Sequence, residues 1–98
     1  MLDITHTSEI VRTTLVDLFA KNCRSLPPNG RLSISKHPNR VIVYKDEDFN
    51  ELFDVYHRVN GRIVEKHDRH GVHIDDLPAI VEEFLFADME FNDSAKTG

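Results

Sequence analysis

The 98-residue chain has little of what marks several specialised classes of protein. Its one cysteine, Cys23, excludes an intrachain disulfide and a four-thiolate metal site, and it suits a reducing cytosol. Four glycines and four prolines are too few for a collagen-like or low-complexity chain. The longest apolar runs are short, such as 41–44 and 84–87, whereas a membrane-spanning helix needs about 20 apolar residues. We therefore expect a protein without a membrane span.

The N-terminal residues lack the basic region and the apolar stretch of a signal peptide. Together with the single cysteine, this predicts a cytoplasmic protein. What the chain does have is 30 Leu, Ile, Val and Phe residues, a fraction well above the roughly 20% below which disorder is expected. Its length suffices for one hydrophobic core. We predict a single α+β domain over residues 1–91 and a flexible C-terminal tail over 92–98.

Charge is distributed unevenly along the chain. The net charge is −5, from 12 Lys and Arg against 17 Asp and Glu. Residues 1–45 hold seven basic and three acidic residues, net +4, whereas residues 46–98 hold five and fourteen, net −9. Such asymmetry between the halves indicates a partner chosen by charge, and it carries no information about the fold.

Apolar spacing divides the first half of the chain into a helix and a hairpin. Residues 8–23 place apolar side chains three and four apart, which is typical of an amphipathic helix. Two prolines and an Asn-Gly pair within 26–30 end this helix. Residues 31–36 alternate polar and apolar, and 41–45 are β-branched and aromatic, so both are predicted strands. The four-residue turn 37–40 joins them as an antiparallel hairpin.

The orientation of the second strand stays open at this point. Either Val41 and Val43 or Ile42 and Tyr44 face the core, because both pairs are apolar and alternate along the strand. If both pairs are buried, the strand is covered on both faces.

The next segment is predicted to be helical. Asp48 and Glu51 have the spacing of a capping box, and an apolar stripe follows at steps of three and four. The stripe consists of Phe49, Leu52, Phe53, Tyr56, Val59 and Ile63. Because Asn60-Gly61 lies within the stripe, residues 48–69 form either one helix or two helices with a break.

A last helix is predicted after Asp75 or Asp76, either of which is a suitable N-cap. Its apolar face is made by Leu77, Ile80, Val81, Phe84 and Leu85. The element order is then helix, strand, strand, one or two helices, and helix. The fold class is therefore α+β, with a small antiparallel sheet packed against helices.

Carboxylates dominate the second half, and we expect some of them to bind a partner. Five acidic residues lie within 46–54, and residues 70–95 contain no Lys or Arg. Some of these carboxylates lie at predicted helix N-termini, where the helix dipole favours them. As a surface, the carboxylates of this half repel nucleic acid and attract basic protein surfaces. The residues predicted to contact a basic partner are Asp46, Glu47, Asp54, Glu82, Glu83, Asp88 and Glu90.

We therefore expect a small non-enzymatic protein-binding module without a cofactor, of the inhibitor, adaptor or immunity type. No P-loop, other glycine-rich phosphate loop or nucleophile elbow appears in the sequence. Cys23 lies at the edge of the apolar face of the first helix, where a small buried side chain is expected. The apolar stripe within 48–69 leaves a helix-mediated homodimer open.

Nucleic-acid binding is a second hypothesis. Steps of four, four and three place four basic residues on one face of the predicted middle helix, as in a phosphate-contacting ridge. These residues are Arg58, Arg62, Lys66 and Arg69. No aromatic residues interleave with them, and a net charge of −5 opposes non-specific DNA binding. The alternative interpretation is a solvated helix face in which Glu65 pairs with its basic neighbours.

A third hypothesis is metal binding by the histidines His67, His70 and His73. On a helix only neighbouring pairs of the three share a face, and on a strand they alternate between faces. A bend at Gly71 would let all three converge, but their spacing matches no metal motif such as H-E-x-x-H. We predict exposed histidines at a helix end and no metal site, with this cluster as the weaker alternative.

Overall fold

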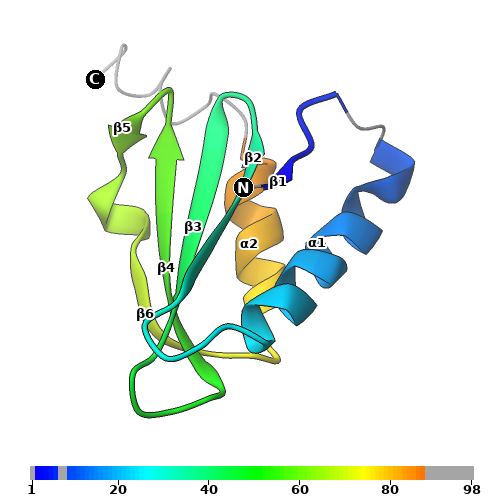
Figure 1. Cartoon of the computed structure of the whole chain (residues 1–98). Helices are drawn as coiled ribbons and strands as arrows, with labels where there is room; N and C mark the ends of the chain where they lie inside the picture. The colour runs from blue at the N-terminus through cyan, green and yellow to red at the C-terminus, as the bar shows by residue number, and fades with distance from the viewer. Residues whose placement is uncertain (1, 7–8, 88–98) are drawn as a thin grey trace.

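Six strands form one mixed sheet in the computed structural model, which describes residues 2–6 and 9–87 (Figure 1). The strands are β1 (Leu2–Asp3), β2 (Arg31–Lys36), β3 (Asn39–Lys45), β4 (Leu52–Val59), β5 (Arg62–Ile63) and β6 (Arg69–His73). β1 to β4 are neighbours in that order, and β4 pairs on its other edge with both β5 and β6. β1 runs parallel to β2, and the other pairs are antiparallel. The predicted domain end at 91 and the predicted tail 92–98 lie outside the described residues.

Two α-helices of the described chain, α1 (Glu9–Arg24) and α2 (Leu77–Leu85), lie on the same side of this sheet (Figure 1). They pack against each other and against β2 and β3. A short 3-10 helix, η1 (Glu65–His67), connects β5 to β6. Within residues 2–6 and 9–87, no helix has the length and apolar character needed to cross a membrane.

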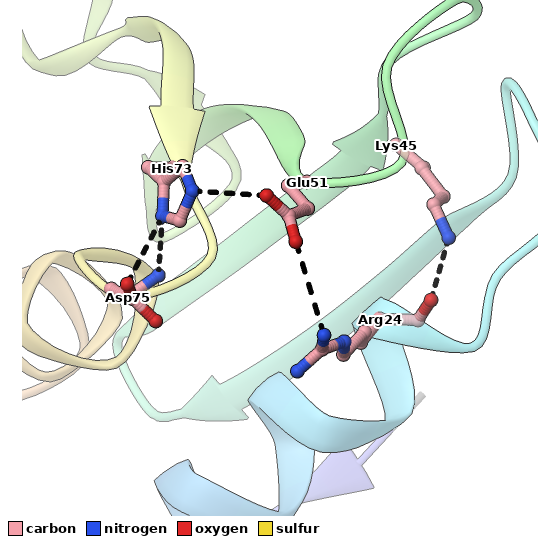
Figure 2. Close-up of polar contacts among 5 residues, drawn as sticks. All are labelled: Arg24, Lys45, Glu51, His73 and Asp75. Carbon is pink, nitrogen blue, oxygen red and sulfur yellow. Dashed lines mark hydrogen bonds and ion pairs between the residues drawn. The ribbon is translucent and has the colours of Figure 1, made fainter.

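A buried lysine caps the C-terminal end of α1. Lys21 and Arg24 in its last turn suit the negative pole of the helix dipole. The ammonium Nζ of Lys45, a residue only 6% exposed, donates a hydrogen bond to the main-chain oxygen of Arg24 (Figure 2). The contact satisfies one of the helix-end carbonyls and fixes α1 against the end of β3.

The core lies between the sheet and the helices. In β3 and β4 every second residue is buried, as expected of strands with one covered side. The side chains that meet there include Val16, Phe19, Cys23, Ile34, Val41, Val43, Phe53, Val55, Leu77, Val81, Phe84 and Leu85. Each such side chain contributes roughly 1.5–3 kcal/mol when fully buried, so this layer supplies most of the hydrophobic stabilisation. Neither α-helix covers the other side of the sheet, which we call the open face.

The predicted α+β class is confirmed, as are the first helix, the hairpin and the last helix. The helix expected at 8–23 is α1, and the last helix, α2, begins after Asp76 with Pro78 in its first turn. The turn of the hairpin is shorter than predicted, because β3 begins at Asn39. Only His37 and Pro38 connect the two strands.

The structure also decides the orientation of β3. Val41 and Val43 are fully buried against the helices, whereas Ile42 and Tyr44 lie half-buried on the open face. This strand is therefore covered by helices on one side only, and two large side chains are left on the other.

The helix predicted over 48–69 is wrong, since this segment forms β4, β5 and η1. The sequence does contain an apolar stripe at steps of three and four. However, Phe53, Val55 and Val59 also fit the period of two that is typical of a strand. The polar residue His57 fills the third of the four buried positions of β4 and conceals this alternation. The predicted capping box is a loop in which Asp46 Oδ2 accepts hydrogen bonds from main-chain amides 48 and 49.

Asn60 and Gly61 form the turn between β4 and β5. Both have positive φ, 52° and 80°, as a two-residue hairpin turn of type I′ requires. The predicted helix treated this pair as an internal weakness, although Asn-Gly between apolar runs is a strong hairpin signal.

Candidate functional site

The antiparallel register sets out the side chains of the open face in three rows across β2, β3 and β4. From the β2–β3 turn outward, the rows are Ser35, Arg40 and Arg58; then Ser33, Ile42 and Tyr56; then Arg31, Tyr44 and Asp54. We call them the first, middle and third row. The rows combine cationic, aromatic and anionic side chains on a surface that neither α-helix covers.

Two tyrosines form the aromatic centre of this face. The rings of Tyr44 and Tyr56 meet edge to face with centroids 5.6 Å apart, and Tyr56 meets the His70 ring in the same way at 5.8 Å. Burial raises the pKa of Tyr56, and the carboxylates of Asp54 and Asp68 raise it further. The phenol of Tyr56 thus stays neutral in an anionic setting.

A hollow of about 700 Å³ lies beside these rings. Its apolar and aromatic lining is Ile42, Tyr44, Tyr56 and Ile63. Five carboxylates line it, from Asp46, Glu47, Asp54, Glu65 and Asp68, and so do two cationic residues, Lys45 and Arg58. We call this region the acidic hollow. Its walls come from β3, β4, β5, η1 and the β3–β4 loop, so only the folded sheet assembles it.

Local contacts hold two of these carboxylates in place. Asp46 is fixed by the loop amides described above, at 2.8 and 3.0 Å. Asp54 Oδ1 accepts a hydrogen bond from the main-chain N–H of Gly71 at 3.3 Å and lies 3.5 Å from Nδ1 of His70. The hollow is therefore partly pre-organised for a cationic group.

Three arginines surround a smaller depression of about 440 Å³ next to the acidic hollow. Arg31, Arg40 and Arg58 line it together with Ser33 and Ile42. The Nε of Arg40 donates to Ser35 Oγ at 3.3 Å, and Nη1 of Arg31 to the Tyr44 hydroxyl at 3.5 Å. We call these three residues the arginine cluster. The open face thus has a basic part and an acidic part, which adjoin at Ile42 and Arg58, the two residues that line both depressions.

The structure brings together only some of the predicted partner-binding carboxylates. Asp46, Glu47 and Asp54 all line the acidic hollow. Glu82 and Glu83 lie on α2, which packs against the opposite side of the sheet. The other two predicted residues, at positions 88 and 90, lie outside the described part of the chain. The seven carboxylates therefore do not form one surface.

The predicted basic ridge of the middle helix is wrong, because that helix does not form. Arg58 points to the open face, but Arg69 lies on the helix side, with its guanidinium 5.3 Å from the centroid of the Phe84 ring. Arg62 is paired opposite the buried Val59, and Lys66 lies on η1. Successive side chains of a strand point to opposite faces of the sheet. Residues whose spacing would place them on one face of a helix are therefore divided between the two faces of the sheet.

The three histidines of the predicted cluster have three separate environments. His70 lies beside Asp54 on the open face, and His67 lies in the core layer described below. His73 accepts a hydrogen bond from the Asp75 amide at Nδ1, 3.1 Å away, so its Nε2 carries the proton toward Glu51, 3.2 Å away. Figure 2 shows Glu51 between His73 and Arg24. Across residues 2–6 and 9–87, no group of three His, Cys, Asp or Glu side chains is placed to hold a metal ion.

A buried histidine network on the core side of β4 was missed by the sequence reasoning. His57 is fully buried, and its ring lies nearly parallel to those of His67 and Phe84, with centroids 5.1–5.2 Å apart. The Nδ1 atoms of His57 and His67 are 2.9 Å apart, and Nε2 of His57 lies 2.8 Å from Oδ1 of Asn39. The signal in the sequence was the alternation of Phe53, Val55 and Val59 around position 57.

The hydrogen bonds of this network fix where its protons lie. Nδ2 of Asn39 donates to the main-chain oxygens of Leu85 and Ala87, at 3.1 and 2.8 Å. Oδ1 of Asn39 is therefore the acceptor, and Nε2 of His57 is the donor. Because its lowered pKa keeps His57 neutral, Nδ1 of His57 accepts, and Nδ1 of His67 carries the proton between the two rings. A second proton on His57 would disrupt this arrangement.

The strongest pKa shifts of the described residues belong to core groups. Burial and the neighbouring His67 lower the pKa of His57 to about 4. Burial also lowers the pKa of His67, and the nearby charges of Lys66 and Arg69 add to the effect. Burial raises the pKa of the Cys23 thiol to about 12, which keeps it protonated and unreactive.

Protein-family models, curated proteins and solved structures were compared with this chain, and none of them matches. The chemistry of the open face indicates what kind of group can bind there. A guanidinium or ammonium group placed over a tyrosine face gains a cation–π contact, and a carboxylate beside it adds a charge-assisted hydrogen bond. The acidic hollow offers both partners within one concave surface.

Proposed function

We propose that this chain is a non-enzymatic protein-binding module whose open face is its binding surface, without a cofactor. The observation that carries the proposal is the acidic hollow. It sets five carboxylates around Tyr44 and Tyr56, on the side of the sheet that lacks α-helices. Aromatic side chains at the centre of a patch with a charged rim are typical of protein–protein interfaces. The partner presents basic side chains, which the hollow attracts over a distance and then orients.

The positions of the reactive groups support a role without catalysis. Cys23 and His57 have strongly shifted pKa values, but both side chains are fully buried on the core side of the sheet. The shift of His57 has a structural cause, since both of its ring nitrogens are engaged by Asn39 and His67. We also propose a cytoplasmic location, in which the free thiol of Cys23 stays reduced.

Single-stranded nucleic acid is the second candidate ligand of the same face. The arginine cluster beside Tyr44 and Tyr56 combines cations with stacking surfaces, as in single-strand binders. Of the ridge residues predicted to bind nucleic acid, only Arg58 belongs to this cluster. The five carboxylates of the adjoining hollow repel phosphate, and we therefore favour a protein partner.

A titration with a fluorescent hexa-arginine peptide tests the proposal. The Glu47→Gln/Asp54→Asn double variant removes two charges from the acidic hollow and keeps the shape of both side chains. Exposed charge contacts contribute about 0.2–1 kcal/mol each, so the Kd should rise by about two- to thirtyfold. The matched control, Glu82→Gln/Glu83→Gln, removes two charges from α2 on the other side and should change the Kd less than about twofold.

If both pairs of substitutions weakened peptide binding equally, the proposal would be contradicted, because the affinity would then depend only on the net charge of the protein. The same titration with a labelled single-stranded RNA distinguishes the second candidate. Phosphate contacts are strongest at low salt, so RNA binding at about 50 mM salt that is lost in Arg40→Ala would favour nucleic acid instead.

A further inference from the structure

We infer that the partner of the open face is a second copy of this chain, an inference that rests on the proposed function. The argument starts from β4, whose outward residues are Asp54, Tyr56 and Arg58 in that order. An anion and a cation thus lie on either side of an aromatic ring, along one strand. If a second copy of this strand faces the first in the antiparallel direction, the anion of each copy meets the cation of the other and the aromatic rings meet each other.

A two-fold axis along the middle row makes this complementarity explicit. In a symmetric dimer, if residue i contacts residue j of the second copy, j also contacts i. Rotation about an axis across the strands, through Ile42 and Tyr56, exchanges the first row with the third row. Arg58 then faces Asp54 of the second copy, and the reverse pair forms by symmetry.

The same rotation matches the neighbouring strand. Arg40 of the first row comes to face Tyr44 of the second copy, which is a cation–π arrangement. Ile42 and Tyr56 lie near the axis and pack against their own copies. Two of the three cluster arginines of the other subunit, Arg40 and Arg58, therefore face the third row beside the acidic hollow, whereas Arg31 faces Ser35 of the other copy.

An axis parallel to the strands is less favourable. It would place Arg40 against Arg40 of the second copy, because β3 lies in the middle of the three strands. Like charges that meet directly repel each other, and in the across-strand arrangement both copies of Arg40 avoid this contact. Packed sheets keep their strands within about 30° of each other, which the across-strand axis permits.

An exposed aliphatic side chain extends the same interface. Ile63 is 64% exposed and lies opposite Arg58 in the β4–β5 pair, so it continues the first row. The rotation places it toward the edge of the third row, where His70 contacts Asp54. Its burial adds a hydrophobic contribution to the charge pairs.

Sedimentation velocity of the full chain from roughly 1 µM to 1 mM tests this inference. We expect a dimer, and we expect Arg58→Asp to raise its dissociation constant at least about tenfold, since two like-charge contacts replace two ion pairs. The double variant Asp54→Arg/Arg58→Asp exchanges the two charges and should restore the dimer. The control Lys21→Asp makes the same charge change on α1, at an exposed residue across the sheet, and should remain dimeric.

A wild-type chain that stays monomeric overturns the inference, and so does a dimer that Arg58→Asp leaves intact. Circular dichroism of each variant distinguishes lost association from lost folding. If the chain is monomeric but hexa-arginine still binds in the acidic hollow, the second-copy inference fails and the proposed function stands. If neither association nor peptide binding occurs, both fail.

Discussion

His57 is a polar residue in a position that the fold otherwise fills with apolar side chains. It is fully buried between β4 and α2, and Asn39 and His67 satisfy its two ring nitrogens. Burial of a neutral imidazole is tolerated when both nitrogens are hydrogen-bonded, whereas a buried imidazolium is not. The stability of the fold should therefore depend on pH chiefly through this residue, and His67, whose pKa burial also lowers, acts in the same direction.

The expected pH dependence follows from the lowered pKa of His57. Its pKa is about 4 in the folded chain, against an ordinary value of 6.5, so the unfolded chain binds the proton more readily between these values. Stability is then fully present above pH 6.5 and is lost as the pH falls toward 4. Between pH 7 and pH 5 this group should remove about 2 kcal/mol from the free energy of unfolding, measurable by urea denaturation.

A matched pair of substitutions isolates the contribution of His57. His57→Gln should remove most of the pH dependence between pH 7 and 5, at the cost of lower stability at pH 7. His6→Gln changes an exposed histidine and should leave the pH dependence as in the wild type. A wild-type chain whose unfolding free energy does not change between pH 7 and 5 would contradict the proton assignment in this network.

Individual residues differ in how far the sequence predicted them. Cys23 was expected in the core because it follows the apolar face of the first helix, and it is fully buried there. The burial of His57 was missed because its side chain gives no apolar signal. The sequence places its partner Asn39 in a turn, so the pattern gives no sign of the hydrogen bond that makes this burial possible.

The segment 48–69 shows how an element can satisfy two periodicities at once. Apolar residues are dense enough there that steps of two and steps of three to four both find a match. Helix 8–23 and strand 31–36 were predicted correctly because only one period fits each of them. For 48–69 the deciding signal was local, namely the Asn60-Gly61 pair.

The β4–β5 turn should depend on glycine at position 61. Gly61 has a φ of 80°, and a Cβ there would meet nothing within 4 Å, so a substitution costs backbone strain and not a clash. We expect Gly61→Ala to lower the free energy of unfolding by about 1 kcal/mol. Asn60→Gly, at a φ of 52°, relieves strain and should change it by less than about 0.5 kcal/mol. Equal stability of Gly61→Ala and the wild type in urea would show that the turn does not constrain the chain.

The two halves of the chain differ in net charge, but this difference along the sequence does not correspond to one acidic and one basic surface of the fold. Carboxylates of the same acidic half lie on opposite sides of the sheet, because Asp54 is on the open face of β4 and Glu82 and Glu83 are on α2. The arginine cluster, in contrast, joins Arg31 and Arg40 of the basic half with Arg58 of the acidic half. Strand pairing creates such a cluster between distant residues, and spacing along the sequence cannot reveal it.

The acidic hollow and the arginine cluster are therefore properties of the whole fold. The same sheet that buries Val41 and Val43 against the helices leaves Ile42 and Tyr44 on its other side. A surface that combines half-buried tyrosines, an exposed Ile63 and both signs of charge is suited to contact another protein. The central claim is that this face, and not the helical side, is where two copies of the molecule associate.

Amide chemical shifts of the ¹⁵N-labelled chain, followed on dilution from about 1 mM to about 20 µM, test this claim most directly. Each amide reports on its own surroundings, so the experiment locates the contact surface without any substitution. We predict shift changes in β3 and β4, centred on Ile42 and Tyr56, with α1 and the exposed side of α2 unchanged. Changes confined to the helices, or no changes over this range of concentration, would contradict it.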